Sequence, residues 1–209
     1  MEATIFTVLV LILSVVIHEV AHGWAANALG DPTARLQGRL SLNPIRHIDP
    51  IGSVLIPAIL VLTNSSFLFG WAKPVPYNPY NLKNQRWGEA IVGGAGVATN
   101  LLIAVLFAFI ARAAFGAGMV EFATLASLVT LVNLSLGLFN LIPIPPLDGY
   151  TVLRGLLPYR ASLSLRRIEE RVEAGGILSL ILILFLFSYF FAAPFGALIR
   201  AAFAFLIGA

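Results

Sequence analysis

Two histidines and a glutamate lie within one helical turn of the first long apolar segment, in the sequence HEVAH at residues 18–22. His18 and His22 are four residues apart, so on a helix their imidazoles share a face. Two neutral imidazoles at this spacing can bind a divalent metal ion. In the H-E-x-x-H arrangement the histidines bind zinc, and the glutamate, here Glu19, transfers protons. Because an ionisable group in a membrane helix costs about 3 kcal/mol, these residues indicate a functional site.

The alternative is that these polar residues pair with one another where two helices meet. Asn, Ser or Gln would serve that purpose at a lower desolvation cost. This one turn also carries two of the three histidines in the chain. Both facts favour a metal site over polar packing.

A catalytic zinc ion takes three protein ligands and a water molecule, so a third ligand is needed. The chain has no cysteine, and His47 is one candidate, in a polar loop. Asp148 is the better candidate, because it is the only acidic residue between Glu121 and Glu169 and directly follows the proline-rich stretch 143–147. Prolines leave backbone groups unpaired, which membrane depth tolerates only beside protein or a watery cavity. An ordinary Asp-Gly turn at the membrane surface is the alternative.

The composition indicates that these residues lie in a membrane protein. Of 209 residues, 59% are hydrophobic and 11% are charged, whereas a soluble domain has about 25% charged residues. Apolar runs near the ~20 residues that span a bilayer occur along the whole chain. We therefore expect an all-α polytopic membrane protein with four to six membrane segments, in a single domain over residues 1–209. The N-terminus lacks the features of a cleaved signal, so the first helix is expected to be retained.

Four apolar segments are expected to form membrane helices: 3–29, 89–115, 122–142 and the tail 175–209, which Pro194 divides into a span and a shorter segment. The run 51–62 contains Pro57 and is too short to span, so we expect it to be re-entrant or interfacial. Whether the tail crosses once or twice is left open. The 13 basic and 10 acidic residues give a net charge of +3. We expect the arginines in the loops to orient the protein in the membrane, and we expect no nucleic-acid partner.

The segment 35–42 alternates polar and apolar residues in the sequence RLQGRLSL. This period of two predicts a small membrane-associated β element. Its exposed edge would pair with an extended substrate through main-chain hydrogen bonds. A plain connecting hairpin is an equally good interpretation.

A topological requirement follows if Asp148 is to meet the histidines. His18 lies past the midpoint of its helix, and Asp148 follows the span 122–142, so an even number of crossings must separate them. The spans 89–115 and 122–142 supply two crossings. The arginines of 154–173 predict that this end faces the cytoplasm and that the N-terminus lies outside.

Several motifs together resemble the site-2 proteases, the intramembrane zinc metalloproteases. HEVAH lies in a first membrane helix, GGAGVATN in a later one, and FNLIPIPPLDG at the end of another. LNPIRHIDPIG and GWAKPVPYNP are similar to the compact prokaryotic branch of that family. The resemblance covers about residues 5–157, leaving C-terminal helices at 160–209, and the chain has no room for the PDZ domain that many relatives carry.

The resemblance implies specific roles for the site residues. His18, His22 and Asp148 would bind one Zn²⁺, and Glu19 would be the catalytic base. Asn140, and also Asn100, would position substrate or stabilise the transition state; an interhelical hydrogen bond is the alternative for each asparagine. The expected partners are the lipid bilayer and a membrane-spanning protein substrate, cut within or near its transmembrane helix in regulated intramembrane proteolysis at the prokaryotic cytoplasmic membrane.

Two rival interpretations remain at this point. A non-proteolytic zinc-binding membrane protein, a transporter or a scaffold, is the first. A transporter is expected to carry ionisable groups in several helices, and a scaffold has no need of Glu19 for ligation. A membrane zinc hydrolase acting on non-peptide bonds is the second, and the resemblance alone argues against it. Substrate identity, cleavage-site preference, gating, oligomeric state and the role of His47 are left open.

Overall fold

The structure is a computed structural model that describes residues 2–62 and 71–208. Residues 63–70, within the connection between the first two predicted spans, and residue 209, at the end of the predicted tail, lie outside the described residues. The helical elements are α1 (Glu2–Ala28), α2 (Thr33–Leu36), η1 (Pro44–His47), η2 (Pro50–Leu55), α3 (Ile56–Leu62), η3 (Pro79–Asn81), α4 (Gly88–Gly116), α5 (Val120–Asn140), α6 (Asp148–Leu156), α7 (Tyr159–Ala174) and α8 (Gly176–Ile207).

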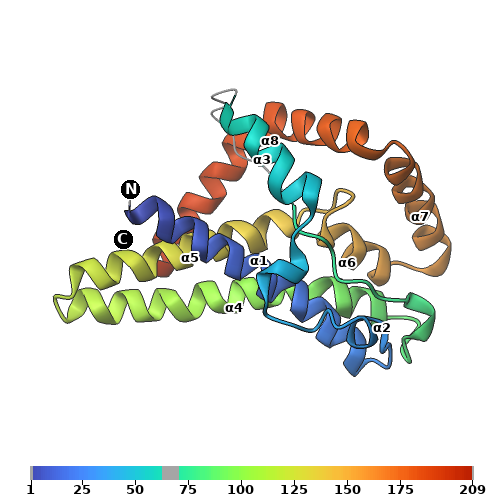
Figure 1. Ribbon diagram of the computed structural model, residues 1–209, viewed down its shortest axis with the longest axis horizontal. Helices are drawn as coiled ribbons and strands as arrows, with labels where there is room; N and C mark the ends of the chain where they lie inside the picture. The colour runs from blue at the N-terminus through green and yellow to red at the C-terminus, as the bar shows by residue number, and fades with distance from the viewer. Residues whose placement is uncertain (1, 63–70, 209) are drawn as a thin grey trace.

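Four of these helices, α1, α4, α5 and α8, are long and apolar enough to cross a membrane. The predicted polytopic helical architecture is therefore confirmed, with four candidate spans in the described part of the chain. The tail forms one helix of 32 residues that contains Pro194, and Figure 1 shows that α8 changes direction along its length. A proline in a helix removes a backbone hydrogen bond and clashes with the preceding turn, which produces such kinks.

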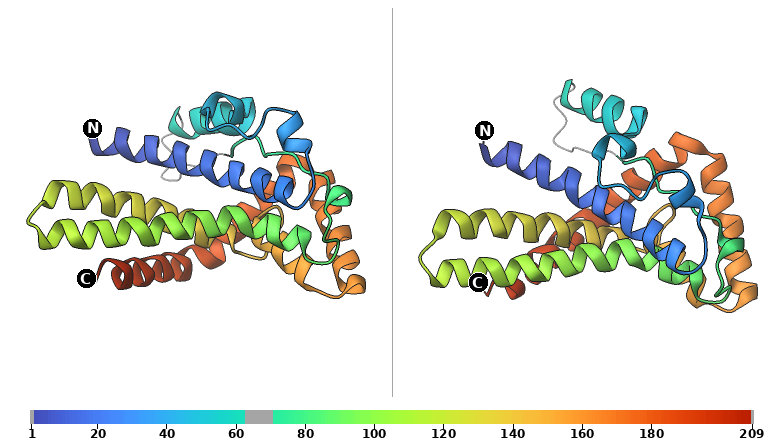
Figure 2. Two further views of the ribbon diagram at one scale, coloured as in Figure 1. Left: turned by 90° about the horizontal axis from the view of Figure 1, so that it is seen from below. Right: turned by 60° about the horizontal axis from the view of Figure 1, so that its bottom comes forward.

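The helices α1, α4 and α5 form the bundle that positions the site. Figure 2 shows them running along one another, with both termini and the α4–α5 turn at one end and α2, α6 and α7 at the other. α4 packs against both α1 and α5. Because α4 and α5 form an antiparallel pair, the chain returns to the end at which α1 finishes, as the crossing count requires.

The β element predicted at 35–42 is wrong, because the structure contains no strand in the residues that it describes. Residues 33–36 form the short helix α2 instead. Gly38 follows it with a φ of 63°. The Gly38 N–H donates to the Arg35 carbonyl, and the Arg39 N–H donates to the Ala34 carbonyl. These two bonds are the Schellman pattern that ends a helix, so the backbone donors are used locally and no strand ladder can form here.

The run 51–62 forms the short elements η2 and α3 and is not among the candidate spans. Figures 1 and 2 show α3 outside the bundle formed by α1, α4 and α5. Side chains of this run, including Val54 and Leu55, are exposed. The prediction that it does not cross is consistent with this arrangement, and its re-entrant or interfacial position stays a prediction.

An ion-pair network fixes the polar end of the chain to the bundle. Arg154 of α6 is buried and contacts Glu89 of α4 at 2.9 Å and Glu169 of α7 at 2.7 Å. Arg166 of α7 contacts Glu89 at 2.7 Å. Since α6 begins at Asp148, this network holds the helix that carries the candidate third ligand against α4.

Candidate metal centre

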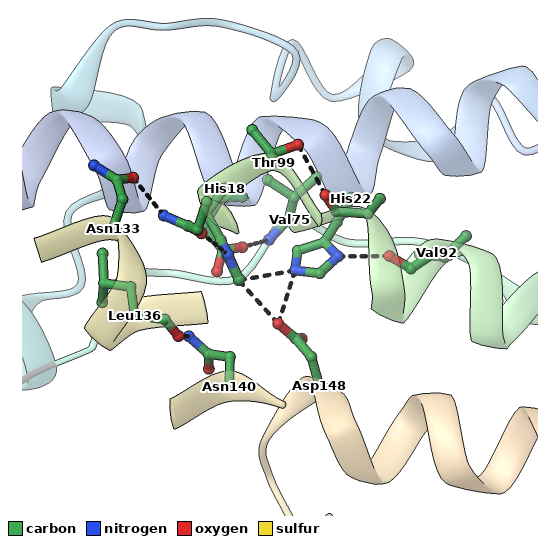
Figure 3. A network of polar contacts seen from close by, with 12 residues as sticks. His18, His22, Val75, Val92, Thr99, Asn133, Leu136, Asn140 and Asp148 are labelled. Carbon is green, nitrogen blue, oxygen red and sulfur yellow. Dashed lines mark hydrogen bonds and ion pairs between the residues drawn. The ribbon is translucent and has the colours of Figure 1, made fainter. Parts of the chain in front are cut away.

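Three side chains from two distant parts of the chain converge beside α4. His18 and His22 of α1 and Asp148 of α6 each offer one ligand atom, and these atoms lie within 4.8 Å of one another. Asp148 Oδ2 is 2.9 Å from His18 Nε2 and 3.3 Å from His22 Nε2, and the two Nε2 atoms are 3.0 Å apart. Figure 3 shows the three side chains pointing toward one another. The structure thus brings together the residues that the sequence proposed as ligands.

The outer nitrogens of both imidazoles are engaged by acceptors. His22 Nδ1 donates to the Val92 carbonyl at 2.7 Å, and His18 Nδ1 lies against Asn100 Oδ1. In a neutral imidazole one nitrogen carries the proton and the other carries a lone pair. The protons therefore lie on the Nδ1 atoms, and both Nε2 lone pairs face the common centre.

A chain of amides fixes the orientation of Asn100. Its Nδ2 donates to Asn133 Oδ1 at 2.9 Å, and Asn133 Nδ2 donates to the Val129 carbonyl at 3.0 Å. A carbonyl can only accept, so each amide has one permitted orientation and Asn100 Oδ1 must face His18. Outer contacts of this kind set the tautomer of ligating histidines.

The donor set fits a zinc ion. Two imidazole nitrogens and one carboxylate oxygen form a known catalytic zinc ligand set, with a fourth position for water. Asp148 Oδ2 is buried and has no hydrogen-bond partner in the described part of the chain beyond the two facing imidazoles. Two lone pairs and a carboxylate directed at one point repel one another, and a cation at that point removes the repulsion.

Gly96 of α4 provides the space for this convergence. A Cβ at residue 96 would lie 2.5 Å from His22 Nε2 and 2.6 Å from His18 Cε1. The glycine-rich start of α4 therefore lets this helix pass directly beneath the two imidazoles. Any side chain at this position would displace them.

Glu19 lies next to the histidines in sequence and is held by a different segment. Its Oε2 accepts a hydrogen bond of 2.9 Å from the Val75 backbone N–H. Val75 is buried and stands between Pro74 and Pro76, which have no N–H. Among residues 74–76 only Val75 has a backbone N–H. The segment 71–78 therefore contacts the proposed base, Glu19, through this one donor.

The remaining predicted site residues are not members of the His-His-Asp group. Asn100 contacts a histidine and does not face the centre. Asn140, at the end of α5, donates from Nδ2 to the Leu136 carbonyl at 3.0 Å; Figure 3 shows it close to Asp148, and its substrate role stays a prediction. His47 is buried and bonds from Nε2 to the Ser41 carbonyl at 2.8 Å, outside the His-His-Asp group.

Sequence reasoning missed Asn133, Gly96 and Val75. A buried asparagine at the centre of an apolar span is unusual enough to have indicated Asn133. The glycines of the run GGAG could have indicated a close helix approach at Gly96, although not its partner helix. Nothing in the local sequence connects Val75 with Glu19, because 56 residues separate them.

A polytopic helical protein with an H-E-x-x-H turn and an aspartate at one buried point has the architecture of a membrane metalloprotease. A match to the model of peptidase family M50 covers residues 112–187. YwhC of Bacillus subtilis, named as a candidate zinc metalloprotease, is 41% identical over 163 residues, which cover 73% of this chain and 69% of YwhC. Rip2 of Mycolicibacterium smegmatis, named likewise, is 29% identical over 142 residues, covering 68% of this chain and 53% of Rip2. No solved structure matches.

The chain belongs to peptidase family M50, the site-2 proteases. Its membership makes it a zinc metalloprotease with several membrane helices. The chain spans about two thirds of YwhC and about half of Rip2.

Proposed function

We propose that this protein is an intramembrane metalloprotease that hydrolyses peptide bonds within or near the transmembrane helix of a membrane-protein substrate. The observation that carries the proposal is the convergence of His18, His22 and Asp148 within 4.8 Å. Two of the three ligand atoms belong to the candidate span α1. Both histidines are buried, with 6% and 9% of their surfaces exposed.

In this proposal His18, His22 and Asp148 hold one zinc ion. When bound, zinc supplies a Lewis acid that polarises a carbonyl and lowers the pKa of a coordinated water to about 7. Glu19 accepts the proton of the attacking water and delivers it to the leaving amine. The Val75 N–H occupies one oxygen of Glu19, which leaves the other oxygen for this proton transfer.

The proposed substrate class rests on the position of two ligand residues in the candidate span α1. A substrate cleaved at such a buried centre would approach it from the membrane or its boundary. In a transmembrane helix every interior carbonyl accepts a backbone hydrogen bond, so the substrate must unwind locally before cleavage. Asn140, beside Asp148, is the side chain proposed to contact the unwound segment.

We also propose that the metal centre lies toward the cytoplasmic side. Five arginines lie in α6 and α7, at the end of the bundle that carries Asp148: Arg154, Arg160, Arg166, Arg167 and Arg171. Arginine and lysine accumulate in cytoplasmic loops. The N-terminus would then lie on the opposite side of the membrane.

The test uses the whole chain purified in detergent. Zinc content is measured first, and a panel of single-span membrane proteins is then incubated with wild type and with Glu19→Gln. The proposal predicts that Glu19→Gln retains zinc and loses cleavage by a factor of about 10³ or more. Glu121→Gln is the matched control, because Glu121 is exposed at the start of α5.

Mass spectrometry of the products locates the cut. Cleavage within or beside the apolar segment of the substrate supports an intramembrane protease. Cleavage that persists in Glu19→Gln, or that falls only in water-exposed domains, would contradict the proposal.

A further inference from the structure

The segment that begins with α2 contacts the proposed base indirectly. Arg39 is buried, and its Nη2 donates to the Lys73 carbonyl at 2.7 Å and to the Pro74 carbonyl at 3.2 Å. The next backbone donor is the Val75 N–H, which bonds to Glu19 Oε2 at 2.9 Å. A single guanidinium nitrogen therefore holds the two carbonyls that directly precede the amide contacting Glu19.

Neighbouring residues restrict this peptide further. The Lys73 N–H donates to the His47 carbonyl at 2.8 Å. Pro74 and Pro76 have fixed φ angles and no N–H, so Val75 supplies the single donor of its tripeptide. The direction of that donor is set by the Lys73–Pro74 backbone, and Arg39 binds both carbonyls of that backbone.

The Val75 side chain occupies a notch on the same face of α1. Gly23 lies four residues after Glu19, and a Cβ at Gly23 would lie 2.8 Å from Val75 Cγ1 and 2.6 Å from Leu40 Cδ2. Residues i and i+4 of a helix are neighbours on one face. The absence of a side chain at Gly23 lets Val75 pack one turn beyond Glu19, with its amide directed back at the carboxylate.

We propose that Arg39 is a positioning residue for the proposed base: it fixes the 73–75 peptide so that the Val75 N–H holds Glu19 Oε2 and leaves the other carboxylate oxygen for proton transfer. This role rests on the proposed function, because it requires Glu19 to be the base. The same role assigns a task to part of the segment 35–42, in which the structure places no strand. The buried Arg39 holds the peptide that orients the proposed catalytic carboxylate.

Substitution of Arg39 should lower kcat and leave KM nearly unchanged. A carboxylate misplaced by about 1 Å can cost about 10²-fold in rate, while substrate binding does not depend on it. We expect Arg39→Gln to lower kcat about 10- to 100-fold and to change KM less than about threefold. Arg39→Lys, which keeps one charged donor, should recover part of the loss.

A second measurement reports on the contact itself and needs no activity. Hydrogen exchange resolved to single residues within 71–77 follows the Val75 amide. Arg39→Gln should raise its exchange rate about tenfold or more, because the backbone that directs this N–H is released. Arg35→Gln is the matched control: Arg35 is exposed and lies four residues before Arg39, and its side chain has no hydrogen bond or ion pair within the described residues.

The complete experiment compares wild type, Arg39→Gln, Arg39→Lys and Arg35→Gln for zinc content, kcat, KM and exchange. Retained zinc, a reduced kcat and faster Val75 exchange in Arg39→Gln alone would support the proposal. A kcat equal to that of Arg35→Gln, a kcat that falls only with zinc content, or unchanged Val75 exchange would overturn it.

If Arg39→Gln does not fold, Arg39→Lys carries the same comparison, with a smaller decrease in kcat expected. A wild type that retains zinc but cleaves no substrate would overturn the proposed function and, with it, the positioning role of Arg39 in catalysis. The exchange measurement would still show whether Arg39 holds the Val75 amide, so the two failures can be told apart.

Discussion

At the end of the bundle that carries the termini, α4 and α5 meet through buried alanines, whereas toward the other end buried amides and glycines occupy the same two helix faces. On α4 the face runs through Gly96 and Asn100 and then through Ala104, Ala108 and Ala111. On α5 the corresponding face begins at the end of the bundle that carries the termini. It runs through Ala123, Ala126, Thr130, Asn133 and Gly137. The spacing is three or four residues throughout, so each set follows one stripe of its helix.

The two ends of the α4–α5 interface differ in what their buried residues do. Small residues let membrane helices approach closely and gain van der Waals contacts. The alanines do this without any polar group. Asn100 and Asn133 do it at the cost of burying amides, and their hydrogen bonds lead to His18. Substitutions in the polar half of the interface, which contains Asn100 and Asn133, are therefore expected to change metal affinity. Substitutions in the apolar half, which contains the alanines, are expected to change the free energy of unfolding.

The largest effect is expected at Gly96. Gly96→Val places a side chain where even a Cβ would lie 2.5 Å from His22 Nε2. The imidazoles must move, so zinc affinity should fall by more than about 10²-fold and cleavage should disappear. Gly94→Ala is the control, because a Cβ there meets only Val152 Cγ2 at 3.8 Å. Competitive titration with a zinc chelator measures the zinc affinity of both variants. Equal zinc affinities in Gly96→Val and Gly94→Ala would refute the close approach of α4 to the imidazoles.

The next effect is expected at the amide chain. Asn100→Ala removes the acceptor of His18 Nδ1 and releases the tautomer and the ring orientation. Loss of such an outer contact typically lowers metal affinity 10- to 100-fold. Asn133→Ala should act in the same direction with a smaller loss, since Asn100 keeps its contact with His18. Isothermal titration with zinc measures the affinity of each variant. A larger loss of zinc affinity in Asn133→Ala than in Asn100→Ala would contradict the expected order.

In the apolar half, Ala108→Leu should reduce stability and leave the metal centre intact. Ala108 is 2% exposed, and overpacking a tight contact costs about 1–3 kcal/mol in the free energy of unfolding. Thermal unfolding in detergent should show a lower Tm, while zinc affinity stays within about twofold of wild type. Phe109→Leu, on the exposed face of α4, should change neither. A loss of zinc affinity in Ala108→Leu would show that the two halves are coupled.

A smaller, pH-dependent effect on stability is expected at Asp31, which lies between α1 and α2. Burial opposes ionisation of this carboxyl, but hydrogen bonds from Thr33, Asn81 and Asn78 outweigh it and lower its pKa below 3.8. A lowered pKa in the folded state stabilises the protein above the unfolded-state pKa, and this stability is lost as pH falls through the folded-state pKa.

Asp31→Asn should therefore lower the free energy of unfolding by about 1–2 kcal/mol near pH 7. The difference from wild type should narrow when the pH falls below about 4. Unfolding curves at several pH values measure this, with Glu170→Gln, at an exposed residue of α7, as the control. A difference that grows in acid would have the wrong sign for a lowered pKa.

The sequence allowed the spans and the three converging residues to be predicted for one physical reason. In lipid each ionisable group carries a large cost, so the few present are informative. The HEVAH turn and Asp148 stood out against apolar surroundings. The helix ends predicted at residues 29 and 142 also lie within two residues of those observed, at Ala28 and Asn140.

The segment 35–42 could not be predicted correctly from alternation alone. A short helix closed by Gly38 generates the same pattern of polar and apolar residues as a strand over so few positions. Two kinds of contact distinguish the helix from a strand: the local hydrogen bonds that end α2 at Gly38, and the tertiary bonds from Arg39 to the Lys73 and Pro74 carbonyls. The contacts of Asn133 and Val75 are also tertiary, which is why local patterns did not reveal them.

The central claim is that His18, His22 and Asp148 bind one zinc ion. X-ray absorption at the zinc edge of the purified whole chain tests it directly. We predict one zinc per chain, two imidazole nitrogens at about 2.0–2.1 Å and carboxylate or water oxygens at about 2.0–2.2 Å, with zinc lost in His18→Ala and in Asp148→Ala. A zinc stoichiometry and spectrum that are unchanged in both variants would contradict the claim.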